Sequence, residues 1–175
     1  GLIPLFAVET IEPELLEKLP RFRRRMEWFI RYRPQLWSRM ASLASPGAGG
    51  RRLLSIVDAE RLHRVLDRLV DPQQFLSPYG LRSLSREHDG RPYELRLNGE
   101  AHTVRYEPGE SSSSMFGGNS NWRGPIWFPV NFLMIESLQK YHHYFGDSLR
   151  VEMPDLGGEQ LTLDELSSEL SQRLI

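Results

Sequence analysis

A long apolar segment in the second half of the chain constrains the fold most. Residues 126–135 contain one conventionally polar residue, Asn131. A surface helix normally carries a polar face, whereas a helix that is apolar on all sides is covered by neighbouring elements. We therefore predict a sandwiched helix that starts at Pro125 or Pro129 and ends at Phe145. An inner helix of a two-layer helical toroid and a central helix of an ordinary bundle both fit this pattern.

Three prolines and two capping patterns predict further helices. Pro13 and Pro20 suit the first turns of two helices near the N-terminus, and Pro34 should end or kink the second one. Farther along, Asp58 and Thr162 each precede apolar residues at helical spacing and are candidate N-caps. A glutamate three residues after Thr162 completes a capping box. The two apolar stripes are Leu62, Val65, Leu66 and Leu69, and Leu163, Leu166, Leu170 and Leu174.

The clearest local prediction is a β-hairpin inserted at about residues 92–107. Its centre, Asn98-Gly99, suits a two-residue type I′ turn, which needs positive φ at both positions. The register that follows pairs Leu97 with Glu100, Leu95 with His102, and Tyr93 with Val104. Tyr93, Leu95, His102 and Val104 should then share one face of the hairpin.

The composition excludes several classes of protein. Apolar residues make up 39% and charged residues 26% of the chain, as in a protein with a folded core. The net charge of −1 gives no reason to expect nucleic acid or an anionic membrane as partner. The chain has no cysteine, which excludes disulfides and cysteine-ligated zinc and favours a cytoplasmic location. No apolar run is long enough for a membrane span.

Both ends of the chain are unusual for natural termini, which are normally polar and loosely held. Residues 1–8 contain almost no polar side chain, and the last residues belong to the predicted C-terminal helix. We interpret residues 1–175 as a single segment of a larger domain. A processed small protein with a buried N-terminal strand is the alternative.

Two loops combine aromatic side chains, glycine and arginine. Their residues are Asn121, Trp122, Arg123 and Gly124 in one loop, and Tyr79, Gly80 and Arg82 in the other. An indole can pack against the C–H face of a pyranose, while amide and guanidinium groups supply the fixed polar contacts of a concave site. Two such loops favour a shared sugar-binding pocket. The alternative is a tryptophan–arginine stack that closes an edge of the core.

Other patterns give no strong indication of a second chemistry. His142 and His143 are adjacent and point about 100° apart on a helix, so they cannot easily share a metal. The glycine pattern of a nucleotide loop and the serine motif of a hydrolase elbow do not occur, and we expect no cofactor. Arginines and aromatics alternate in residues 21–33, as in some nucleic-acid modules, but acidic neighbours balance them and a solvated face is expected.

Three carboxylates are candidates for acid–base chemistry. Glu136 lies on the predicted apolar helix, and Glu107 and Glu110 lie next to the serines of the loop at residues 109–118. A buried carboxyl with a raised pKa can act as a general acid at neutral pH. The alternative for each is an exposed or salt-bridged acid without a catalytic role.

The two aromatic–arginine loops resemble the C-terminal catalytic region of glycoside hydrolase family 63, the family of processing α-glucosidase I. The resemblance rests on NWRGPIW, residues 121–127, and SPYGLRSLS, residues 77–85, which occur in the expected order. Together these blocks anchor residues 75–146. The residues outside them are compatible with the family but carry no signature of their own.

The resemblance implies a mainly α fold: an incomplete arc of an (α/α)6 toroid in which the inserted hairpin is the one β element. It implies inverting hydrolysis of an α-glycosidic bond in an oligosaccharide, with one carboxylic acid and one carboxylate as catalytic groups. It places these residues near the sugar subsite: Asn121, Trp122, Arg123, Gly124, Tyr79, Gly80 and Arg82. The family's aspartate acid and glutamate base belong to blocks that we do not find, so we name no catalytic residue.

We therefore expect an isolated chain without hydrolase activity that needs the remainder of its parent domain. An open arc would expose apolar surface, so self-association is also expected. A non-catalytic carbohydrate-binding or protein-interaction module is the alternative function.

Overall fold

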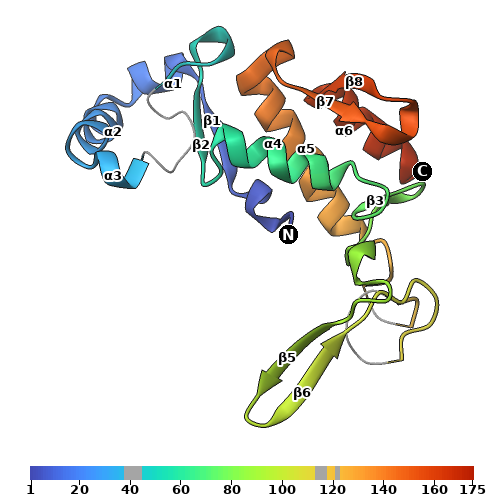
Figure 1. Ribbon diagram of the computed structural model, residues 1–175. Helices are drawn as coiled ribbons and strands as arrows, with labels where there is room; N and C mark the ends of the chain where they lie inside the picture. The colour runs from blue at the N-terminus through green and yellow to red at the C-terminus, as the bar shows by residue number, and fades with distance from the viewer. Residues whose placement is uncertain (38–44, 113–117, 121–122) are drawn as a thin grey trace.

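The computed structural model describes residues 1–37, 45–112, 118–120 and 123–175 (Figure 1). The α-helices in these residues are α1 (Pro13–Lys18), α2 (Pro20–Tyr32), α3 (Pro34–Trp37), α4 (Ala59–Leu69), α5 (Phe128–Phe145) and α6 (Leu163–Arg173). The strands are β1 (Val8–Ile11), β2 (Arg52–Ser55), β3 (Leu76–Ser77), β4 (Gly80–Leu81), β5 (Tyr93–Leu97), β6 (Glu100–Val104), β7 (Arg150–Met153) and β8 (Glu159–Thr162).

The described strands form four antiparallel sheets of two strands each. β1 pairs with β2, which brings together segments far apart in the sequence, whereas β3–β4, β5–β6 and β7–β8 are local pairs. The hairpin β5–β6 projects from the rest of the molecule (Figure 1). Its register, including Leu97 opposite Glu100 and Leu95 opposite His102, confirms the prediction.

The predicted fold class is wrong. We expected a mainly α arc of an (α/α)6 toroid with one hairpin, but the described residues contain four small antiparallel sheets and no toroidal arc. The strands outside the predicted hairpin are only two to four residues long, which is too short for a visible alternation of apolar and polar residues. The pairing of β1 with β2 also depends on tertiary contacts that periodicity along the chain does not report.

α5 lies at the centre of the core and packs against α6 and the β1–β2 sheet (Figure 1). α4 contributes to the same core and contacts β7. Each helix contributes a row of fully buried side chains: Leu62, Leu66 and Leu69 from α4, Met134, Leu138 and Tyr141 from α5, and Leu163, Leu166 and Leu170 from α6. Burying one such side chain contributes roughly 1.5–3 kcal/mol, so these rows fix how the helices sit against one another.

The two predicted N-caps are confirmed. The backbone N–H of Arg61 donates to the carboxylate of Asp58 at 2.8 Å. At the start of α6, the N–H of Glu165 donates to the Thr162 hydroxyl oxygen at 3.2 Å, and the N–H of Thr162 donates to the Glu165 carboxylate at 2.7 Å. These bonds satisfy backbone donors that have no partner within the helix, which is why both helices begin there.

α5 is covered on one side only, which corrects the expectation of a sandwiched helix. Met134 and Leu138 are fully buried, whereas Phe128, Phe132 and Leu133 on the other side are 59%, 54% and 47% exposed. The helix begins at Phe128, with Pro129 in its first turn, so the later of the two proposed starts is nearer. None of the described helices is long and apolar enough to cross a membrane.

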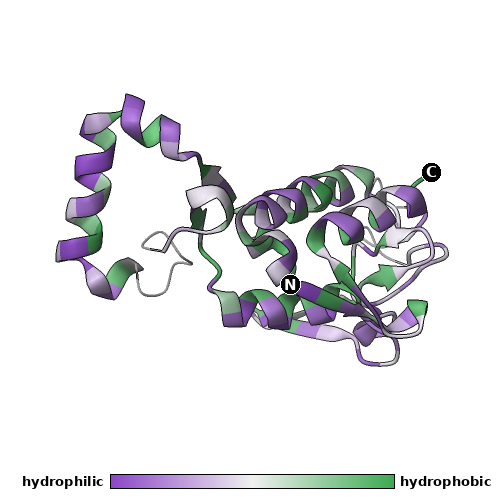
Figure 2. Cartoon of the chain, turned by 90° about the horizontal axis from the view of Figure 1, so that it is seen from above, coloured by the Kyte–Doolittle hydropathy of each residue, from purple (hydrophilic) through white to green (hydrophobic). Residues whose placement is uncertain are grey.

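Part of the apolar N-terminal segment is buried, although Ile3 is 74% exposed. Leu2, Leu5, Val8 and Ile11 belong to the core, the last two as part of β1. In contrast, α2 buries none of its residues and stands apart from the core together with α1 and α3 (Figures 1 and 2). The predicted roles of the prolines are confirmed, since α1 and α2 begin at prolines and α2 ends before Pro34.

Tyr141 makes the stability of the chain sensitive to alkaline pH. Its hydroxyl lies 2.8 Å from the Ser55 hydroxyl in the core, and burial raises the pKa of the Tyr141 phenol above its ordinary value of 10.0. Above about pH 10 the phenol ionises in the unfolded chain before it does so in the folded chain. The stabilisation is therefore complete below about pH 10 and is lost as the pH rises through the folded-state pKa.

Urea unfolding between about pH 9 and about pH 11 should consequently show a steeper loss of unfolding free energy in the wild type than in Tyr141→Phe. At pH 7 the same substitution should cost about 1 kcal/mol because Ser55 loses a hydrogen-bond partner. Parallel pH profiles for the two proteins would contradict this role of Tyr141.

Candidate functional site

The two aromatic–arginine loops lie side by side. The backbone N–H of Ser83 donates to the Pro125 carbonyl at 2.8 Å, and Arg82 forms an antiparallel bridge with Ile126. The Ser83 hydroxyl adds a bond of 2.8 Å to the Gly124 carbonyl. The structure thus joins the NWRGPIW and SPYGLRSLS blocks, which are separated by the hairpin in the sequence.

Asn131 holds the loop that carries Tyr79, Gly80 and Arg82 against α5. Its side-chain oxygen accepts from the N–H of Leu81 at 2.6 Å, and its amide nitrogen donates to the carbonyls of Leu81 and Trp127 at 3.0 and 3.1 Å. The side chain is 1% exposed, so these bonds form away from water. The lone polar residue of the apolar segment therefore attaches β4 to the first turn of α5.

Gly80 is the point at which this loop approaches α5 and α6 most closely. Its φ is +106°, a conformation that residues with a side chain rarely adopt. A Cβ atom at this position would lie 2.8 Å from Cδ2 of Leu174 and 2.9 Å from the side-chain oxygen of Asn131. Gly80 thus serves the packing of the loop and leaves no space for a ligand at that point.

Arg82 is held by the loop itself. Its Nε donates to the Tyr106 hydroxyl at 3.1 Å, and Nη1 donates to the Pro72 carbonyl at 3.0 Å and to the carbonyl of Leu76. These contacts orient the guanidinium and occupy several of its five donors. Arg82 therefore shapes the wall of the site.

Arg123 stacks on Trp127 at the edge of a cavity. The centre of its guanidinium lies 4.7 Å from the centroid of the indole, within the range of a cation–π interaction. The cavity measures about 400 Å³, a size typical of small-ligand sites. Its described lining includes Arg82, Arg123 and Trp127, with Phe75 and Val130 as apolar surface.

The predicted site residues divide into three groups. Arg82 and Arg123 line the same cavity, and Gly124 joins the two loops beside it. Tyr79 does not line this cavity and is 72% exposed, while Gly80 is buried against α5 and α6. Asn121 and Trp122 lie outside the described residues.

A family profile decides the relationship of the chain to known proteins. The C-terminal domain of glycosyl hydrolase family 63 matches residues 51–154, which include both loops and α5. The chain belongs to glycosyl hydrolase family 63.

Proteins similar to this chain come from two yeasts. The chain is 49% identical over its full length to an uncharacterized protein of Saccharomyces cerevisiae, of which it covers 16%. It is 29% identical over 49% of its length to the mannosyl-oligosaccharide glucosidase of the same yeast, covering 7% of that protein. A probable mannosyl-oligosaccharide glucosidase of Schizosaccharomyces pombe is 31% identical over 51% of the chain, with 8% of it covered. The chain thus spans a small part of these relatives, and no solved structure matches it.

The described carboxylates of this family-63 chain do not form a catalytic pair at the cavity. Among its described lining residues, Glu87 is the one acid. Glu136 is exposed, and the hydroxyl and N–H of Ser112 hold the pKa of Glu107 below its ordinary value of 4.5. A lowered pKa keeps Glu107 ionised at neutral pH, the opposite of what a general acid needs.

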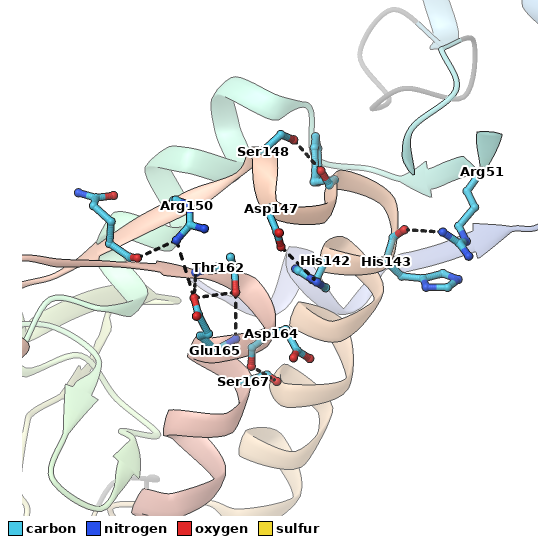
Figure 3. A network of polar contacts seen from close by, with 12 residues as sticks. Arg51, His142, His143, Asp147, Ser148, Arg150, Thr162, Asp164, Glu165 and Ser167 are labelled. Atoms are coloured by element: carbon cyan, nitrogen blue, oxygen red, sulfur yellow. Dashed lines mark hydrogen bonds and ion pairs between the residues drawn. The ribbon is translucent and has the colours of Figure 1, made fainter. Parts of the chain in front are cut away.

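A second polar network lies at the other end of α5 from Trp127 (Figure 3). Glu165 accepts from Thr162 and lies 3.9 Å from Arg150, and His142 lies 4.0 Å from Asp147. The bonds to Thr162 lower the pKa of Glu165. These contacts belong to the helix cap and its surroundings, and the described residues hold no group of three potential metal ligands.

Two contributors to the site were missed at the sequence level. The sequence shows Asn131 only as the polar residue of an apolar segment, and it assigns Ser83 no role of its own. A buried amide within an apolar helix is costly unless it is hydrogen-bonded, so Asn131 did carry a detectable signal. Ser83 had none, because its bonds to Gly124 and Pro125 exist only once the two loops meet.

Proposed function

We propose that this chain forms part of the sugar-binding wall in the catalytic domain of an inverting α-glycosidase that acts on oligosaccharides. Membership of glycosyl hydrolase family 63 and the two glucosidase relatives support a glycosidase-related domain. The substrate and the inverting mechanism are part of the proposal.

The observation that carries the proposal is the cavity at the junction of the two loops. Arg123 and Trp127 present a guanidinium and an indole on its wall, and the Arg82 loop forms another part of the wall. An indole and apolar side chains suit the C–H faces of a sugar, and guanidinium donors suit its hydroxyls. Because Asn131 and Ser83 anchor both loops, these groups are held in place before a sugar binds.

Hydrolysis requires more than this cavity provides. Inversion uses two carboxyl groups roughly 6.5–9.5 Å apart, one as acid and one as base. Glu87 is the one acid among the described lining residues, so the cavity lacks such a pair in this part of the chain. We therefore expect sugar binding without turnover from the chain alone. This same observation favours the second candidate, a non-catalytic carbohydrate-binding module.

Isothermal titration with glucose oligomers tests the binding. We expect saturable heat with the wild type and at least a tenfold weaker affinity for Arg123→Ala, because the variant loses charge-assisted hydrogen bonds worth about 1.5–3 kcal/mol. Arg86→Ala is the matched control, since Arg86 is exposed and does not line the cavity. No binding, or equal binding by both variants, would refute the sugar site.

An assay with p-nitrophenyl α-glucoside separates the two candidates. Joining the chain to the rest of its own longer protein should produce hydrolysis that Arg123→Ala lowers. A longer protein that binds glucose oligomers without hydrolysing them would instead establish the non-catalytic module.

A further inference from the structure

A second cavity adjoins the proposed sugar cavity. It measures about 510 Å³ and runs along α4. Gly1, Leu2, Arg68 and Phe75 line both cavities, which places the two spaces next to each other.

The second cavity is basic. Arg61, Arg64 and Arg68, on one side of α4, line it, and none of its described lining residues is acidic. Arg61 lies 3.4 Å from Asp58, and Arg64 pairs with Glu60 in the preceding turn. Each of these two arginines therefore has a carboxylate partner already.

Arg68 differs from its neighbours on α4. Its guanidinium makes no hydrogen bond or ion pair with another residue in the part of the chain that the structure describes, and its side chain is exposed. It also stands at the boundary between the two cavities, with Phe75 beside it as apolar surface. A guanidinium in this position can offer a fork of N–H donors to a ligand without breaking an internal contact.

We propose that Arg68 and the α4 cavity bind an anionic, phosphate-like group on a ligand whose sugar ring occupies the neighbouring cavity. Arg68 carries the inference, because Arg61 and Arg64 are paired with Asp58 and Glu60, whereas the guanidinium of Arg68 has no carboxylate partner among the described residues. Glu87 is the one acid among the described residues that line the two spaces. Guanidinium groups match the geometry of phosphate oxygens and can bind them through two parallel hydrogen bonds. The sugar part of this inference rests on the proposed function, whereas the anion site does not.

Isothermal titration with glucose, glucose 6-phosphate and inorganic phosphate tests the inference. Glucose 6-phosphate should bind about tenfold more tightly than glucose, and added salt should reduce this difference. Arg68→Gln should abolish the difference. Arg24→Gln, which changes an exposed arginine on α2, should preserve it.

The possible outcomes test the anion site at Arg68 and the proposed sugar-binding function separately. Equal affinities for glucose and glucose 6-phosphate, or a difference that survives Arg68→Gln, would overturn the anion site. Inorganic phosphate that binds through Arg68 while glucose fails to bind would uphold the anion site and refute the proposed function. Failure of all three probes would overturn both, and circular dichroism of Arg68→Gln would confirm that the variant is folded.

Discussion

Replacing Asn131 by alanine should lower the free energy of unfolding by about 4 kcal/mol. The substitution removes three hydrogen bonds and leaves the N–H and C=O of Leu81 without their side-chain partners beneath the loop. Leu81 is 2% exposed, so water cannot readily replace the lost amide. Each buried backbone group left unpaired costs about 1–3 kcal/mol, and urea unfolding would measure the sum.

Ser137→Ala provides the matched control on the same helix. Ser137 is also buried, but its hydroxyl donates only to the Leu133 carbonyl one turn earlier. Alanine favours the helix and leaves that carbonyl in its helical hydrogen bond, so the change should stay within about 1 kcal/mol. Similar losses for Asn131→Ala and Ser137→Ala would show that Asn131 does not anchor the loop.

The second large effect is expected at Gly80. Gly80→Ala should destabilise the chain by about 4 kcal/mol, since a Cβ would meet Leu174 at 2.8 Å and Asn131 at 2.9 Å in addition to the strain of φ +106°. Any movement of the Asn131 side chain away from the added Cβ would also disturb its hydrogen bond with the N–H of Leu81. Thermal and urea unfolding would both detect a change of this size.

Gly90→Ala is the control that separates the cost of backbone strain from the cost of the steric clash. Gly90 has φ +70°, but a Cβ there would meet no atom within 4 Å. Only the left-handed conformation is then strained, and a loss of about 1 kcal/mol is expected. If Gly80→Ala costs no more than Gly90→Ala, the close approach to α5 and α6 is not what requires glycine at residue 80.

These two residues connect stability to the candidate site. Asn131 and Gly80 lie beneath the loop whose next residues, Leu81 and Arg82, lead to the cavity. Their variants should therefore weaken sugar binding even where the chain stays folded, because the loop that carries Arg82 would lose its fixed position. Arg68 is independent of this anchor, so anion binding should be less affected.

Elements whose signals are local could be predicted from the sequence. The Asn98-Gly99 turn fixed the register of β5–β6, and Asp58 and Thr162 marked the starts of α4 and α6. Each signal acts through residues no more than a few positions away, so it appears in the linear pattern. The pairing of the short strands β1 and β2 could not be predicted, because each strand needs a partner from a distant part of the chain.

By itself, the sequence determined the hairpin, the capped helices, the family resemblance carried by two blocks, and the residue types available for binding. Only the tertiary structure decided that these blocks meet, that Arg82 is tied to its own loop while Arg123 stacks on Trp127, and that α5 is covered on one side. The physical reason is that hydrogen-bond geometry and burial depend on residues brought together from distant parts of the chain. Periodicity and composition record a residue's own preferences, but they do not record which neighbours it will have.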